Sequence, residues 1–165
     1  MPTGRGAQPP GLEVVTVNKQ RRRRVDVARL TRVLRRAAEA LDVKGEVALV
    51  LAGDRVLHEM NRTYRGKDKP TDVLSFPGTC QSHAGGPVGA RRDACAACAG
   101  QMASLGDIVI SVETAEQNAK RLKRTLPQEL DVLALHGFLH VLGYDHETDD
   151  GQMERLEKRL RRSAR

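Results

Sequence analysis

Residues 127–146, PQELDVLALHGFLHVLGYDH, are the stretch that decides the fold. Pro127 has the fixed backbone angle that suits a first helical turn, and the residues after it are apolar on almost every side. Gly143 can adopt the left-handed conformation that ends a helix. The stretch therefore predicts a helix from Pro127 to about Leu142 that is buried over nearly all of its surface.

Three histidines in this stretch have the spacing of metal ligands. His136 and His140 are four residues apart, so their rings lie one turn above each other on the same face of the helix. After Gly143 the chain turns back and can deliver His146 as a third ligand. Three protein ligands with a fourth position left to water are typical of catalytic zinc, whereas structural zinc usually has four protein ligands. We expect one Zn²⁺ per chain, held by His136, His140 and His146.

Two other interpretations of these histidines are open. They could be core residues hydrogen-bonded to their neighbours, although two unpartnered imidazoles in so apolar a helix would be costly. The same spacing also occurs in metzincin proteases, in which a glutamate general base follows the first histidine. Here that residue is Gly137, so a metalloprotease would lack its base and is the second choice.

Apolar residues elsewhere recur with the periods of strands and helices. Strands are expected at 12–17, 46–52, 73–76 and 107–111, and helices at 25–41, 55–64, 113–123 and 150–162. This order lacks the strict alternation of a doubly wound sheet. It predicts an α+β fold, a single domain with a small mixed sheet and helices packed on it, whose metal site lies at the C-terminal end of the buried helix. Residues 1–11 are expected to be a flexible N-terminus and residues 12–165 one catalytic domain.

Composition indicates an anionic partner in a reducing compartment. The net charge is +7 and the pI is about 9.8, with blocks of basic residues at 21–24, 120–124 and 155–165. Such blocks bind phosphate backbones by releasing counterions. The four aromatic residues and the absence of Trp argue against a base-stacking platform. Three clustered cysteines, no long apolar run and no secretory signal predict a cytoplasmic protein without membrane contact.

A second motif, NRTYRGKDKPTDVLSFP at residues 61–77, joins a helix to a strand and carries three cations, Arg65, Lys67 and Lys69. Together with the histidine stretch and with LGDIVIS at residues 105–111, it closely resembles the YbeY family of bacterial endoribonucleases. The resemblance extends from about residue 46 to residue 149, and the long histidine motif is highly specific to that family.

The resemblance implies a single-strand-specific, zinc-dependent endoribonuclease that acts in late 3′-end maturation of ribosomal RNA and in ribosome quality control. Its partners would be ribosomal RNA and the small ribosomal subunit, and no DNA is expected. Arg65 matches the family's functional arginine. The expected catalytic residues are therefore Arg65 and His136, with His136 also a zinc ligand.

Chemistry of the site leaves some assignments open. Arg65 would neutralise charge that grows on the phosphorane during cleavage, but no side chain is an obvious general base. Asp145 and Glu147 could orient a ligand histidine or could be solvated carboxylates at the helix end. Besides the metalloprotease, a non-catalytic ribosome-assembly factor remains an alternative, which would bind RNA without turnover.

The segment from Gly78 to Ser104 looks longer than its counterpart in the family and is expected to be a flexible insertion loop. It contains Cys80-x-x-His83 and Cys95-x-x-Cys98, two pairs with the spacing of a closed zinc site. A second, structural zinc on Cys80, His83, Cys95 and Cys98 is therefore an open question.

Overall fold

The computed structural model describes residues 11–78, 104–145, 147 and 150–163. Three predicted features lie outside these residues, except for Gly11, Gly78 and Ser104 at their ends. They are the flexible N-terminus, the insertion with its four candidate ligands, and the third histidine, His146. The described elements, in chain order, are β1 (Leu12–Asn18), α1 (Val27–Ala40), β2 (Gly45–Ala52), α2 (Asp54–Arg65), β3 (Val73–Pro77), β4 (Ser104–Ser111), α3 (Val112–Arg121), α4 (Leu126–Val141) and α5 (Gln152–Ser163).

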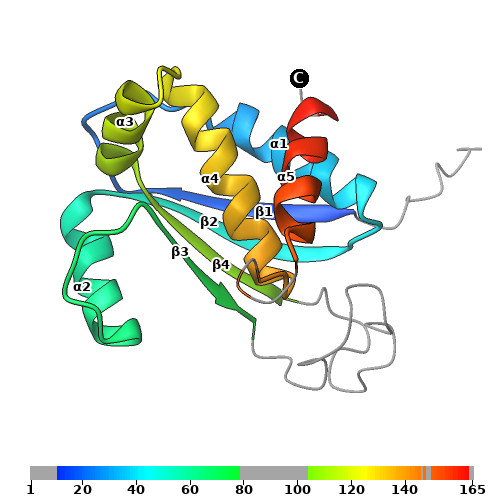
Figure 1. Ribbon diagram of the computed structural model, residues 1–165, viewed down its shortest axis with the longest axis horizontal. Coiled ribbons are helices and arrows are strands. Elements are labelled where there is room, and N and C mark those ends of the chain that lie inside the picture. The colour runs from blue at the N-terminus through cyan, green and yellow to red at the C-terminus, as the bar shows by residue number, and fades with distance from the viewer. Residues whose placement is uncertain (1–10, 79–103, 146, 148–149, 164–165) are drawn as a thin grey trace, which may run out of the picture.

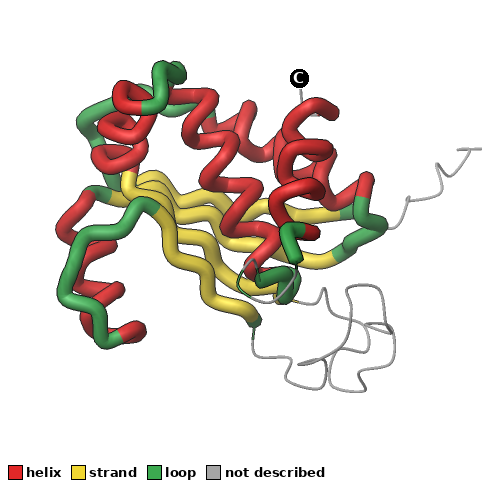
Figure 2. Tube along the Cα trace, in the orientation of Figure 1, coloured by secondary structure: helices red, strands yellow, loops and turns green. Residues whose placement is uncertain are grey.

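The strands form one sheet of four, in the order β1-β2-β4-β3 (Figures 1 and 2). β1, β2 and β4 are parallel, and β3 pairs antiparallel with β4 at one edge. The register between β2 and β4 shifts at Glu46/Val47, where Gly106 takes a φ of 139°. A Cβ at Gly106 would lie 2.2 Å from the carbonyl oxygen of Phe76, so this bulge requires glycine.

Helices cover the two faces of the sheet unequally. Most buried apolar side chains of α1, α3, α4 and α5 belong to one large core cluster with Ile108 and Ile110 of β4. Leu57 of α2 belongs to a smaller cluster, which includes Leu74 and Val109. Because neighbouring residues of a strand face opposite sides of the sheet, α2 packs on the face opposite α4, as Figure 1 shows.

Local sequence explains why α4 is the central helix. Thr125 and Gln128 form a capping box at its N-terminus, and a proline lies in its first turn. Nine of its residues are buried, namely Glu129, Leu130, Leu133, Ala134, Leu135, Gly137, Phe138, Leu139 and Val141. The predicted α+β fold with a small mixed sheet and a buried histidine helix is confirmed. No helix in the described part of the chain is long and apolar enough to cross a membrane.

Candidate functional site

The end of α4 places the first two histidines of the motif on one side of the helix. His136 and His140 are each half-buried, and their rings are 4.6 Å apart between centroids at an angle of 80°. The two Nε2 atoms are 3.1 Å apart. The two ring nitrogens therefore lie close together on one side of the helix.

α4 ends just beyond the pair, as expected. The N–H of Gly143 donates to the carbonyl of His140, the N–H of Tyr144 donates to that of Leu139, and Gly143 has a φ of 96°. This positive φ is the reason for a glycine at the point where the chain leaves the helix.

Two ligands of a tetrahedral zinc ion fit the spacing of these Nε2 atoms. With Zn–N bonds of about 2.0–2.1 Å, two ligand nitrogens would lie about 3.3 Å apart, close to the 3.1 Å found here. Among the described residues, no group of three His, Cys, Asp or Glu side chains could hold a metal. The expected third ligand, His146, lies outside those residues, so the described donor set is a pair that fits two corners of the ion.

A carboxylate from another helix contacts the first histidine. Glu157 of α5 places Oε2 3.2 Å from Nδ1 of His136, and its side chain is only 15% exposed. Sequence reasoning missed Glu157 and considered Asp145 and Glu147 for this role. In the structure both are exposed, and the Asp145 carboxylate accepts from the N–H of Glu147 in a local turn. The missed signal was an acidic residue between Met153 and Leu160 on the buried side of α5.

Gly137 explains why the helix lacks the glutamate of a metalloprotease. A Cβ at this position would lie 2.7 Å from Cγ2 of Ile108 and 3.1 Å from Oγ of Ser75. The position after the first histidine therefore faces the sheet, and a glutamate side chain has no room there. This packing argues against the metzincin alternative.

Arg65 lies at the exposed C-terminal end of α2, on the other face of the sheet from the histidines. Gly66 ends this helix in the left-handed conformation. The loop after it is held by the buried Asn61, whose side-chain amide donates to the carbonyl of Lys69 at 2.8 Å. The structure thus brings His136 and His140 together but does not bring Arg65 into contact with them. Both α2 and α4 nevertheless pack on the edge strand β3.

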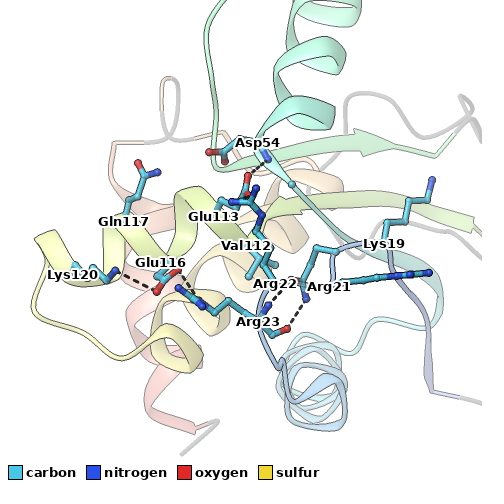
Figure 3. A pocket seen from close by; sticks show the side chains of 12 residues that line it. Lys19, Arg21, Arg22, Arg23, Asp54, Val112, Glu113, Glu116, Gln117 and Lys120 are labelled. Carbon is cyan, nitrogen blue, oxygen red and sulfur yellow. Dashed lines mark hydrogen bonds and ion pairs between the residues drawn. The ribbon is translucent and has the colours of Figure 1, made fainter.

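A groove of about 750 Å³ lies at the C-terminal ends of the parallel strands β1, β2 and β4, near the beginnings of α2 and α3 (Figure 3). Its cations are largely paired with carboxylates of α3. Arg22 contacts Glu113 at 3.0 Å, while Arg23 and Lys120 contact Glu116 at 2.9 and 3.3 Å. The hydrogen bond from Arg23 lowers the pKa of Glu116, so this carboxylate stays ionised. Because three of the five cations of this groove are already matched by carboxylates and its described lining contains no histidine, the histidine pair is the better candidate for a chemical site.

Comparisons with known proteins identify the family of this chain. Residues 15–164 match the family model described as Endoribonuclease YbeY. The chain is 48% identical over 124 residues to an endoribonuclease YbeY from Moorella thermoacetica, with 74% of each chain covered. It is 39% identical over 132 residues to one from Koribacter versatilis, covering 80% of this chain and 73% of the relative.

A structural comparison supports the fold. The solution structure of TM1509 from Thermotoga maritima matches with a TM-score of 0.56 at 23% identity, and the match covers 93% of this chain and 88% of that one. The match over residues 15–164 and the sequence identity to its relatives show that the chain belongs to the endoribonuclease YbeY family.

Proposed function

We propose that the protein is a zinc-dependent, single-strand-specific endoribonuclease that acts in the 3′-end maturation of ribosomal RNA. The observation that carries the proposal is the pair of Nε2 atoms 3.1 Å apart at the end of a buried helix, in a chain of the endoribonuclease YbeY family. The half-exposed rings leave room for a substrate on the solvent side of the pair.

His136, His140 and His146 are the proposed zinc ligands, with one ion per chain. Bound zinc supplies a Lewis acid that polarises a phosphoryl oxygen or lowers the pKa of a coordinated water. His136 and His140 do two things for this chemistry. They would hold the cation, and their position on a packed helix would keep it in a fixed place.

Arg65 is the proposed electrostatic catalyst. Its guanidinium is exposed and makes no ion pair with any described residue, so its planar set of donors is available to a phosphate. RNA that passes around the edge strand β3 can reach both the end of α2 and the end of α4. In that path Arg65 neutralises charge on the phosphoryl group as it develops.

Ribosomal RNA on the small ribosomal subunit is the proposed substrate in the cytoplasm. Support comes from the net charge of +7 and from exposed cations on several elements, since phosphate contacts dominate RNA affinity. Neither DNA nor a membrane is a proposed partner.

The proposal is tested by cleavage of a structured precursor ribosomal RNA with metal-quantified protein. Chelator should abolish cleavage, and added zinc should restore it. His140→Ala should lose both zinc and cleavage, because two histidines make a weak site. Arg65→Ala should keep its zinc and its melting temperature, yet cleave roughly a hundredfold more slowly, the usual scale for loss of one donor to a developing oxyanion. Arg65→Lys should recover little, because a point charge lacks the bidentate geometry.

His58→Ala is the matched control. His58 lies on α2 and contacts Asp68, so its removal should leave the zinc content unchanged. Salt-sensitive RNA binding without any cleavage would favour a ribosome-assembly factor instead, and cleavage of a peptide would favour a metalloprotease. Wild-type rates in Arg65→Ala, or loss of its zinc, would show that the catalytic role of Arg65 is wrong.

A further inference from the structure

We propose that Glu157 is a positioning residue of the metal site, which holds His136 in the ring tautomer that presents Nε2 to the ion. The inference rests on the proposed function, because it assigns a residue to the same zinc. It concerns a helix that lies outside the histidine motif.

The argument begins with hydrogen-bond chemistry. An ionised carboxylate only accepts hydrogen bonds, so the 3.2 Å contact between Glu157 Oε2 and His136 Nδ1 requires the proton on Nδ1. A neutral ring protonated on Nδ1 has its lone pair on Nε2. That Nε2 is the atom that lies 3.1 Å from Nε2 of His140. The contact therefore selects the ring form that a metal needs.

Packing of α5 holds the carboxylate in place. Met153, Leu156 and Leu160 are buried and fix this helix in the main core. Glu157 lies between them in the sequence and shares their side of the helix, so its side chain is carried toward α4. Arg161, one turn later, places Nη1 4.0 Å from the other carboxylate oxygen. Loss of a carboxylate that orients a ligand imidazole in this way typically lowers metal affinity or activity by about 10–100-fold.

Zinc affinity is the main readout, measured by competition with a chelator of known affinity and without RNA. Glu157→Ala should bind zinc about 10–100-fold more weakly than wild type. Glu157→Gln keeps an oxygen that can accept from Nδ1, so it should lose much less. Glu154→Ala is the control on the same helix, since Glu154 is exposed and contacts Lys158; its zinc affinity should match wild type.

A second readout needs no metal. In chelator-treated wild type, ¹⁵N NMR of the histidine rings should find the His136 proton on Nδ1, and Glu157→Ala should lose this preference. Equal zinc affinity in Glu157→Ala and Glu154→Ala would overturn the inference, as would a His136 proton on Nε2 in wild type. If Glu157→Ala does not fold, the inference is tested by the zinc affinity of Glu157→Gln and by the position of the His136 proton in the wild-type spectrum. Wild type without zinc affinity would instead refute the proposed metal, and the spectrum would still test Glu157.

Discussion

At Gly137 a single missing Cβ sets how closely the histidine helix approaches the sheet. The atoms around this site are Cγ2 of Ile108, Oγ of Ser75 and Cγ2 of Val73, at 2.7, 3.1 and 3.3 Å from an ideal Cβ. Ile108 is completely buried and branched at Cβ, so it has little freedom to move away. The glycine therefore serves packing at a position where helix propensity alone would favour alanine.

Gly137→Ala tests this balance. Alanine should gain about 1 kcal/mol from helix propensity, but overpacking a tight core typically costs about 1–3 kcal/mol. We expect a net loss in the free energy of unfolding, measured by urea denaturation. Gly11→Ala is the control, because a Cβ there meets nothing within 4 Å. A variant at Gly137 more stable than wild type would show that the helix has room to move.

Arg124, which lies between α3 and α4 in the basic block at residues 120–124, forms an ion pair that stabilises the fold. Arg124 Nη1 lies 2.9 Å from Oε2 of Glu129, whose side chain is only 4% exposed. The sequence grouped Arg124 with Lys120, Arg121 and Lys123 as a surface for RNA. Its partner in the first turn of α4 could not be foreseen, because a glutamate there is equally well explained as a favourable charge at a helix N-terminus.

Arg124→Ala should therefore destabilise the fold by about 1–3 kcal/mol, because it leaves the Glu129 carboxylate buried without this partner. This cost is below that of breaking a fully buried pair, since the Arg124 side chain is 34% exposed. Arg121→Ala, which removes only an exposed contact to Asn118, should stay within about 0.5 kcal/mol of wild type. Chemical denaturation of the two variants compares them directly, and equal stabilities would contradict the assigned task.

The bounds of helices and strands are predicted well where the apolar pattern continues over many residues, and less well where a single residue interrupts that pattern. The buried helix was expected from Pro127 to Leu142 and is found at Leu126–Val141. β4 was expected at 107–111 but begins at Ser104, because Gly106 at the bulge hides the strand pattern. The order of strands and the antiparallel edge strand β3 were not predicted, since pairing depends on packing between segments far apart in the sequence.

At the scale of the whole molecule, the net positive charge has to be corrected for ion pairs. In the basic block at residues 21–24, two arginines are paired with carboxylates of the described residues and two are not. Arg22 and Arg23 contact Glu113 and Glu116, whereas Arg21 and Arg24 are exposed and make no ion pair with any described residue. Arginines already matched by carboxylates release fewer counterions when RNA binds. The charge of the sequence therefore overstates what this block offers to RNA.

We predict that Arg21→Ser with Arg24→Ser flattens the salt dependence of RNA affinity, by about 0.7 in log–log slope for each phosphate that the protein no longer neutralises. Arg22→Ser with Arg23→Ser is the matched control with the same change in charge, and its slope should change less. The slopes come from binding titrations across a range of salt concentrations. If the control pair has the larger effect, Arg22 and Arg23 leave their carboxylates when RNA binds.

The candidate site itself was only partly readable from the sequence. Spacing of four on a helix was enough to bring His136 and His140 together, because local geometry fixes it. Glu157 was missed because it lies 21 positions after His136 in the chain, and no helical or strand period relates the two positions. Arg65 was assigned through its motif alone, and its place across the sheet from the histidines depends on how α2 packs.

The hydrogen bonds between the beginnings of α2 and α3 also affect how the protein unfolds. The N–H of Asp54 donates to Glu113 Oε2, while the Asp54 carboxylate accepts from the N–H and hydroxyl of Thr114. Each helix thus supplies a carboxylate that caps the other, although the two lie on opposite faces of the sheet. Since α2 has only a small apolar cluster of its own, it would otherwise detach at little cost. Release of α2 removes Asp54 from the N–H of Thr114 and leaves it with the N-cap oxygen of Ser111, so we expect the loss of α2 to weaken the first turn of α3 as well.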